Sequence, residues 1–145
     1  MVDCNLEEGL EATEPRVTEI RREWYWVKKG IEEILAEQPQ LTFRPEDVYA
    51  ECVNGNALLW VTYEGFVITT SRKDTFSGDE TFLFWIAWAK QRGRNCVIKH
   101  LPFFENKARE AGFKYVELRT PIKELEEYFL KQDWMKDTVI YTRGL

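Results

Sequence analysis

The sequence predicts an α/β (α+β) domain in which helices cover both faces of one central sheet. The run from Phe82 to Trp88 is apolar at every position, which is typical of a strand buried on both faces. Around it, segments with helical spacing of apolar residues alternate with short strand-like segments. The predicted order of elements is β-α-α-β-β-β-α-β-α-β.

The chain has 145 residues, of which 44% are hydrophobic and 31% are charged. This length fits one domain with a core of its own. Residues 1–14 contain Glu7, Glu8, Glu11 and Glu14 and few large apolar side chains. We therefore expect a flexible acidic arm over residues 1–14 and a single domain over residues 15–145.

Charge and cysteine content exclude several classes of protein. The chain has 20 basic and 25 acidic residues, and a net charge of −5 disfavours binding to a phosphate backbone. No nucleic acid is expected as a partner, although Lys90–Arg94 and Lys99 form a small basic cluster. The three cysteines form no CxxC pair, which indicates a reducing, intracellular protein without a metal cluster. No apolar run is long enough for a membrane span.

The first half of the domain contains two helices and a hairpin. Arg16–Ile20 alternates like a strand, and Trp24–Leu35 has its apolar residues on one helical face. Gly30 is a weak point inside that helix, costing about 1 kcal/mol against Ala. A second helix starts near Pro45 and ends after Val53. Strands Ala57–Tyr63 and Phe66–Ser71 are joined at Glu64-Gly65, where we expect Gly65 to supply a positive φ.

The second half continues with helix, strand, helix and strand. A regular apolar stripe covers Asn95–Ala111, with Pro102 either kinking this helix or starting its regular part. The remaining predicted elements are a strand at Tyr115–Arg119, a helix at Pro121–Lys131 and a last strand at Thr138–Thr142.

Two motifs resemble the GNAT acetyltransferase superfamily. Arg92-Gly93-Arg94-Asn95-Cys96-Val97 stands where that family has its phosphate loop, Arg/Gln-x-x-Gly-x-Gly/Ala. Ala108–Lys114, with the sequence Ala-Arg-Glu-Ala-Gly-Phe-Lys, stands where the following helix ends. The resemblance implies a mixed, mostly antiparallel sheet with helices on both faces. It also implies that Arg92, Gly93, Arg94, Asn95, Cys96 and Val97 are what remains of an acetyl-CoA loop.

The chain departs from the family pattern at the positions that bind and catalyse. Asn95 and Val97 replace the loop glycines, and a branched side chain at Val97 would obstruct a phosphate. In the family's fourth helix, Phe129 replaces the Tyr that is the usual general acid, and Asp133 replaces a Gly. Phe129 cannot donate a proton, so the acid is missing unless Tyr128 supplies it. Glu80 could serve as a base, but a single Glu beside a loop is usually solvated.

A narrower resemblance is to small GNAT-like proteins encoded among tailed-phage structural genes, whose phosphate loops are similarly eroded. The shared features are Glu46-Asp47-Val48-Tyr49, Leu59-Trp60-Val61, Gly65-Phe66-Val67, the apolar fourth strand, the helix end and a short final strand at the C-terminus. This resemblance implies a phage protein that is associated with the virion or acts in morphogenesis.

Several residues have both a structural and a functional interpretation. Trp85 and Trp88 could plug the groove beside the fourth strand or could pack in the ordinary core. Trp24, Tyr25 and Trp26 cannot all face one side of a helix, so at least one should be exposed, and the three are a candidate protein interface. His100 has no neighbour at metal-ligand spacing. Cys52 and Cys96 are predicted to be small buried side chains rather than nucleophiles.

Two functions follow from these patterns. The first is a non-catalytic GNAT-like protein, without catalytic residues, metal or cofactor, that binds other proteins such as virion or phage assembly components in the host cytoplasm or virion. The alternative is an active acyl-CoA-dependent N-acetyltransferase with acetyl-CoA as cofactor. In that case backbone N–H groups of the fourth strand would polarise the thioester carbonyl.

Overall fold

The computed structural model describes residues 14–91, 96–120 and 122–145, with only the backbone of Cys96. A five-stranded sheet has the order β1-β2-β3-β4-β5, in which all neighbours are antiparallel except the parallel pair β4–β5. The elements are β1 (Arg16–Thr18), α2 (Ile20–Glu37), α3 (Pro45–Val53), β2 (Ala57–Val61), β3 (Gly65–Lys73), β4 (Glu80–Ala89), α4 (Cys96–Lys99), α5 (Leu101–Glu110), β5 (Tyr115–Leu118) and α6 (Lys123–Lys131).

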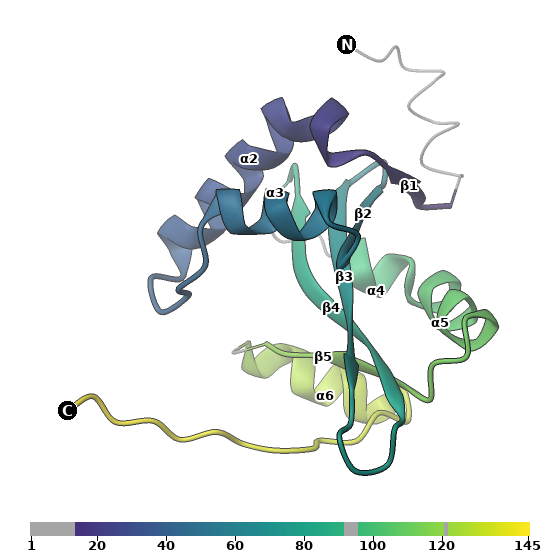
Figure 1. Cartoon of the computed structure of the whole chain (residues 1–145). Coiled ribbons are helices and arrows are strands. Elements are labelled where there is room, and N and C mark those ends of the chain that lie inside the picture. The colour runs from purple at the N-terminus through teal and green to yellow at the C-terminus, as the bar shows by residue number, and fades with distance from the viewer. Residues whose placement is uncertain (1–13, 92–95, 121) are drawn as a thin grey trace.

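Helices cover both faces of the sheet, as the sequence predicts (Figure 1). On one face, α2 and α3 pack on the sheet through a cluster that includes Ile31, Val48, Phe66 and Ile86. On the other face, a second cluster joins the sheet to α4, α5 and α6; its members are Trp60, Val67, Phe82, Phe84, Ala89, Val97, Leu101, Phe104, Ala108 and Phe129. The predicted fold class is therefore confirmed. None of the helices in the described residues has both the length and the apolarity that a membrane crossing needs.

The predicted central strand is β4, which pairs with β3 on one side and β5 on the other. Its register with β3 is interrupted by a bulge. Thr69 is opposite Phe84, but the preceding Ile68 is opposite Ile86, so Trp85 is an extra residue in β4. The bulge changes which side chains face which layer.

Two glycines are required by close packing rather than by backbone angle. A β-carbon on Gly65 would lie 2.0 Å from the carbonyl oxygen of Trp88, and Gly65 has no positive φ, so the predicted reason for this glycine is wrong. A β-carbon on Gly30 would lie 2.7 Å from the Phe66 ring and 2.8 Å from the Trp88 ring. Gly30 therefore allows α2 to approach the sheet closely.

The long predicted helix over Asn95–Ala111 is divided near His100 in its described part. α5 begins at Leu101, which places Pro102 in its first turn. Pro is tolerated there because the first N–H groups of a helix have no partner within the helix. This agrees with the expectation that the regular part of the helix starts near Pro102.

Two predicted strands differ from the structure. Arg16–Ile20 is a strand only as far as Thr18, because α2 begins at Ile20. Thr138–Thr142 is not assigned as a strand and pairs with no described strand. That prediction is wrong for this chain by itself, because a strand needs a neighbouring edge as well as a suitable sequence. The expected arm over residues 1–14 lies outside the described residues except for Glu14.

Candidate functional site

The sheet opens between β4 and β5. β5 pairs with β4 only from Thr81 to Phe84, whereas β4 continues to Ala89. Figure 1 shows β5 leaving the direction of β4 beyond this point. In the described residues, no strand pairs with this side of β4 after Phe84.

The bulge determines which backbone groups of β4 face this opening. Before the bulge, the Glu80 carbonyl accepts a hydrogen bond from the Lys114 N–H, so even-numbered residues face β5. After the bulge, the Lys90 N–H donates to the Glu64 carbonyl at 2.8 Å, so even-numbered residues face β3. Because successive residues of a strand direct these groups to opposite edges, the N–H and C=O of Ala87 face the opening.

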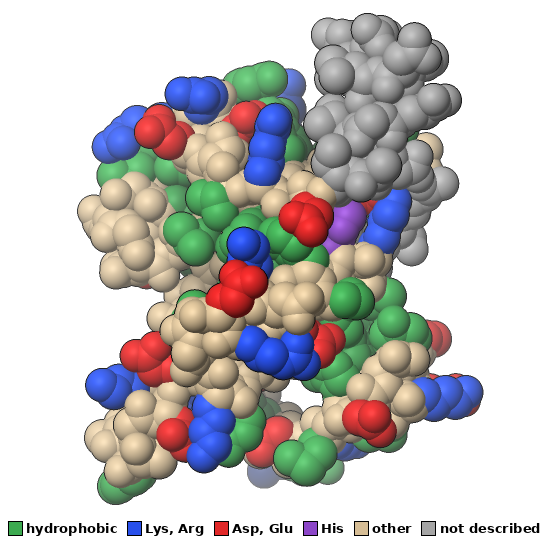
Figure 2. All heavy atoms as spheres, turned by 90° about the vertical axis from the view of Figure 1, so that its right-hand side faces the viewer, with side chains coloured by type: hydrophobic (Ala, Val, Ile, Leu, Met, Phe, Trp, Pro, Cys, Tyr) green, Lys and Arg blue, Asp and Glu red, His purple; other side chains and the backbone are tan. Residues whose placement is uncertain are grey.

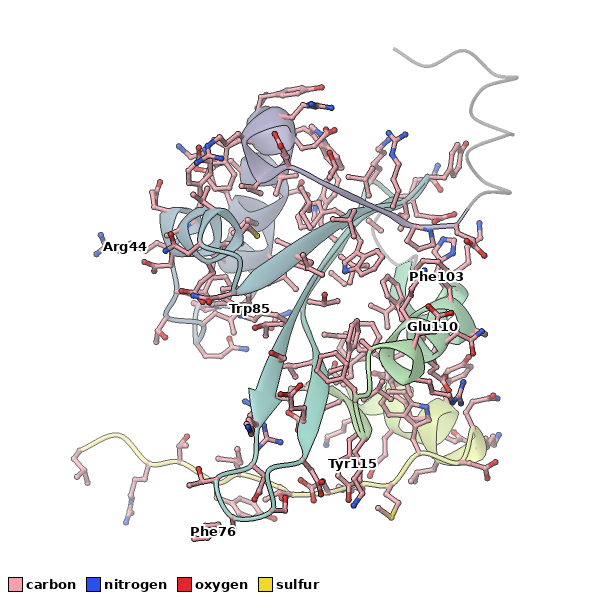
Figure 3. The ribbon with its side chains drawn as sticks, turned by 45° about the vertical axis from the view of Figure 1, so that its right-hand side comes forward. Arg44, Phe76, Trp85, Phe103, Glu110 and Tyr115 are labelled. Carbon is pink, nitrogen blue, oxygen red and sulfur yellow. The ribbon has the colours of Figure 1, made fainter. Side chains whose placement is uncertain are left out.

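The two tryptophans of β4 lie on the α2 and α3 face. Trp85 is labelled in Figure 3. Its ring packs edge-on against that of Phe43, which precedes α3, with ring centroids 5.5 Å apart. Trp88 stacks on Phe66 at 5.6 Å and donates from Nε1 to a carboxylate oxygen of Glu33 at 3.2 Å. These contacts are ordinary core packing, which is one of the two alternatives that the sequence left open.

A buried carboxylate lies next to the end of β4. Glu64 is 6% exposed, and its carboxylate accepts hydrogen bonds from the Lys99 ammonium and from Nε2 of His100, the latter at 2.9 Å. Burial raises the pKa of Glu64, but the hydrogen bonds from Lys99 and His100 outweigh it and hold the pKa below its ordinary value. Glu64 thus contacts both Lys90, through the backbone, and the junction between α4 and α5.

Sequence reasoning did not find Glu64. An acidic residue before a glycine in a hairpin turn usually faces solvent, and its two partners are 35 and 36 residues away in the chain. The interpretation of His100 is also changed, since its ring is largely buried against this carboxylate.

The predicted phosphate loop lies mostly outside the described residues. Arg92, Gly93, Arg94 and Asn95 are not described, and neither is the side chain of Cys96. Val97 is described, and its side chain is buried in the cluster that contains Leu101 and Phe104. The predicted obstruction by Val97 is therefore not supported, because its branch points into the core.

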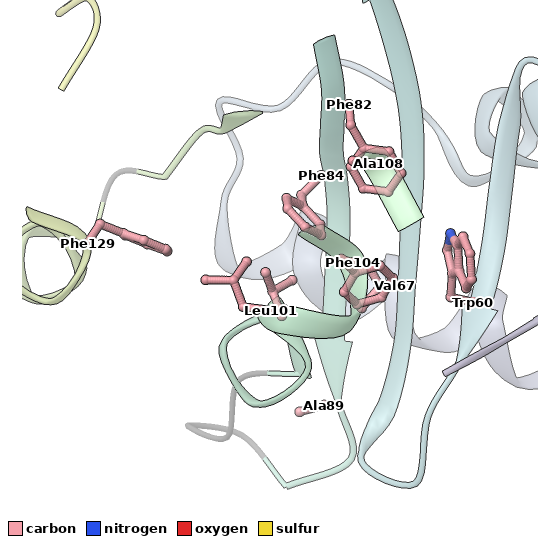
Figure 4. Packing of buried hydrophobic residues seen from close by; sticks show 10 residues of the cluster. Trp60, Val67, Phe82, Phe84, Ala89, Leu101, Phe104, Ala108 and Phe129 are labelled. Atoms are coloured by element: carbon pink, nitrogen blue, oxygen red, sulfur yellow. The ribbon is translucent and has the colours of Figure 1, made fainter. Parts of the chain in front are cut away.

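Phe129, which the resemblance places at the family's general-acid position, is a packed core residue. Phe129 is 8% exposed and faces the cluster that includes Leu101 (Figure 4). Its ring lies 4.8 Å from that of Trp134 and 5.5 Å from that of the half-buried Tyr128. Asp133, which the resemblance aligns with a glycine, has a φ of 64°, a conformation that favours glycine.

Other candidate residues lie away from the opening or are inert. Glu80 is exposed at the beginning of β4, at the opposite end of the strand from Ala89. Burial raises the pKa of the Cys52 thiol to about 11, so little thiolate forms at neutral pH. Among the described side chains, no group of three His, Cys, Asp or Glu lies close enough together to hold a metal ion.

The aromatic group on α2 is divided between the core and the surface. Trp24 packs against Tyr49, with ring centroids 4.9 Å apart, and Trp26 packs against Phe66 at 5.7 Å. Tyr25 is 75% exposed, which confirms that at least one of the three rings faces solvent. Their use as an interface stays a prediction.

The surface that carries α5 is mixed in charge. Lysine, arginine and carboxylate side chains alternate over this face (Figure 2). The described residues on this face therefore do not form one continuous basic patch of the kind that binds nucleic acid.

No family model matches the sequence, and no curated protein matches it. Solved structures with a similar fold include the following three. The BH1408 protein of Bacillus halodurans, as a tetramutant, has a TM-score of 0.69 at 10% identity, covering 92% of this chain and 100% of that one. The aminoglycoside acetyltransferase meta-AAC0020 from an uncultured soil sample has a TM-score of 0.62 at 12% identity, covering 91% and 95%. The ribosomal-protein-alanine N-acetyltransferase of Brucella melitensis has a TM-score of 0.58 at 15% identity, covering 92% and 100%.

These likenesses establish the fold, which is that of the GNAT acetyltransferases. Acetyl-CoA is the cofactor implied by this fold. β4 has the backbone groups that such a site needs, because the N–H and C=O of Ala87 face the opening where β5 no longer pairs with β4. The residues of α6 do not supply the hydroxyl that the resemblance implies, because Phe129 stands at that position and has none.

Proposed function

We propose that this chain is a non-catalytic protein with the GNAT fold that acts by binding other proteins. One observation carries the proposal: Phe129 occupies the position of the general acid and is packed into the core against Trp134. A buried phenyl ring can neither donate a proton nor be replaced by a neighbour without rearranging the cluster.

Under this proposal the protein belongs to a tailed phage and works in the virion or during its assembly in the host cytoplasm. The resemblance of Glu46-Asp47-Val48-Tyr49 and the later segments to phage GNAT-like proteins supports this setting. The exposed ring of Tyr25 supports a contact with protein, since exposed aromatic side chains are enriched where proteins meet.

Calorimetric titration of the full chain with acetyl-CoA tests the proposal. We expect no binding in the low-micromolar range, and binding in that range would contradict the proposal. An Asn95→Gly variant is the matched comparison, because it restores one loop glycine without touching the buried Val97. Tighter binding by this variant would assign the weak affinity of the natural chain to the loop.

An N-acetyltransferase is the second candidate, and the bulge in β4 is the observation that favours it. The bulge turns the Ala87 N–H toward the opening, and Trp85 and Trp88 pack on the α2 and α3 face. When bound there, acetyl-CoA would supply an activated acyl group to an acceptor amine. The chain's own contribution would be to orient the carbonyl through the Ala87 N–H.

Thiol release from acetyl-CoA separates the two functions. The assay uses the full chain with a panel of amine acceptors, including peptides with free N-termini and polyamines. Release that depends on both acceptor and protein would establish the transferase. Release equal to the protein-free control across this panel is the result expected for the non-catalytic protein.

A further inference from the structure

The C-terminal segment after α6 has the sequence of a strand but no strand partner. Residues Thr138–Thr142 are β-branched or aromatic at every position, which is the composition that favours strands. In the structure these residues follow α6 and pair with no described strand. We call Trp134–Leu145 the C-terminal arm.

The arm exposes apolar side chains that a folded domain would ordinarily cover. Ile140 is 76% exposed and Tyr141 is 90% exposed, and Met135 and Val139 are also exposed. Ile140 and Tyr141 are adjacent, so as a strand they would present apolar groups to both of its faces. This distribution indicates a segment that is buried when it is paired.

The same chain has an open sheet edge. β5 is the last strand of the sheet, and no described strand pairs with its outer side. Tyr115 on β5 is 52% exposed, and Ile122 and Leu130, at either end of α6, are exposed to a similar degree. An open edge offers unpaired backbone groups, and Tyr115 adds an exposed aromatic side chain on the edge strand itself.

The root of the arm is fixed on α6, and its free end leads away from the body. The Trp134 ring packs against Phe129 at 4.8 Å. Lys136 Nζ lies 2.8 Å from a carboxylate oxygen of Glu126. Beyond these contacts the arm passes the tip of the β3–β4 hairpin, where Phe76 lies, and ends well outside the helices and sheet (Figures 1 and 3). The described part of the arm thus forms no strand pair with the β5 edge of its own chain.

We infer that the arm pairs with the β5 edge of a second copy of this chain, so that two copies exchange arms in a symmetric dimer. Each copy has both halves of the contact, an unpaired strand sequence and an open edge. A two-fold arrangement therefore satisfies both edges and both arms at once. Main-chain hydrogen bonds supply the pairing, as in other cases of strand addition. This inference does not depend on whether acetyl-CoA binds.

The first test is the solution mass of the full chain. Light scattering across a dilution series should give twice the chain mass of 17.3 kDa at high concentration. A Val139→Pro/Ile140→Pro variant should be monomeric, because neighbouring residues direct their N–H groups to opposite sides and one lost donor must face β5. These side chains are exposed, so circular dichroism should show an unchanged fold.

Two controls make the mass measurement specific. Val139→Thr/Ile140→Thr keeps the N–H groups and the β-branched shape, so it should remain a dimer. Tyr25→Ser removes an exposed aromatic ring on α2, far along the chain from the arm, and should also remain a dimer. A natural chain that is monomeric at every concentration would overturn the inference. A dimer lost with Tyr25→Ser but kept with the proline variant would also overturn it.

Cross-linking distinguishes exchange between copies from folding back on the same chain. Chains carrying Tyr115→Cys are mixed with chains carrying Ile140→Cys and treated with a short flexible bismaleimide, which tolerates shifts of register. Exchange predicts a cross-linked dimer that contains one chain of each kind, above the background that the natural cysteines give in the parent chain. Cross-links that form only within a Tyr115→Cys/Ile140→Cys chain would show folding back and overturn the inference.

Discussion

Nε2 of His100 lies 2.9 Å from a carboxylate oxygen of Glu64, which is 36 residues earlier in the chain. The other carboxylate oxygen accepts a hydrogen bond from Lys99. The backbone carbonyl of Glu64 also accepts from Lys90. One residue of the β2–β3 turn therefore holds both the end of β4 and the α4–α5 junction, which are the two described flanks of the predicted phosphate loop.

Replacing Glu64 by Gln should reduce stability at neutral pH by about 1–3 kcal/mol, the usual cost of weakening buried hydrogen bonds to charged groups. The pKa of Glu64 is lowered in the folded protein, so its contribution is complete above the unfolded pKa of about 4.3 and is lost as pH falls through the folded value. The difference between natural chain and variant, measured by denaturant unfolding, should therefore shrink below about pH 4.3.

The control for this prediction is Glu127→Gln. Glu127 pairs with Lys131 on the exposed surface of α6 at 3.1 Å, so its loss should cost about 0–0.5 kcal/mol. A Glu64→Gln difference that is equally small, or that grows toward acidic pH, would contradict the role given to this carboxylate.

Gly30→Ala should destabilise the protein, although the same change usually strengthens a helix by about 1 kcal/mol. The added β-carbon would lie 2.7 Å from the Phe66 ring and 2.8 Å from the Trp88 ring, and overpacking of this kind costs about 1–3 kcal/mol. Packing should prevail, with a lower midpoint of thermal unfolding. Lys29→Ala, at the exposed neighbouring position, should change the midpoint little. A stabilised Gly30→Ala would show that the two rings move aside freely.

Gly30 and Gly65 also show which parts of the fold could be predicted. Most helices and strands follow from local patterns such as the apolar run of β4, and the structure confirms them apart from a shorter first strand and the absent last one. The reason for Gly30 depends on the rings of Phe66 and Trp88, and the reason for Gly65 depends on the Trp88 backbone, which approach them only in the folded chain. Glu64 was not predicted because its partners, Lys99 and His100, come from a distant segment. Thr138–Thr142 is unpaired because a strand-like composition alone does not place a segment along a sheet edge.

Asp133→Gly should stabilise the protein by about 0.5–1 kcal/mol, because a φ of 64° strains most residues but not glycine. Asp133 follows the end of α6, where the Trp134 N–H donates back to the Phe129 carbonyl at 3.1 Å. The natural reverse case is Gly112, which has a φ of 85° after α5, so Gly112→Ala should lose about 1 kcal/mol. Denaturant unfolding measures both. Equal stability of Asp133→Gly and the natural chain would mean that the Asp side chain offsets the backbone strain.

Phe129→Tyr tests the proposed function at the position that carries it. The phenyl ring is buried in the cluster that contains Leu101 and Phe104. An added hydroxyl would therefore lose its water and cost about 1–3 kcal/mol unless it finds a partner. We expect lower stability in denaturant and no thiol release from acetyl-CoA, because a hydroxyl alone does not restore an eroded site.

The matched variant is Tyr128→Phe, which removes the neighbouring hydroxyl from a half-buried ring. It should leave stability within about 0.5 kcal/mol, as is usual for substitutions outside the core. If the natural chain released thiol and Tyr128→Phe abolished that release, Tyr128 would be the general acid and the protein an enzyme. If Phe129→Tyr gained release without losing stability, the groove would be intact and only the acid would be missing. Loss of stability without any release is the outcome that supports a non-catalytic protein in which α6 serves the core.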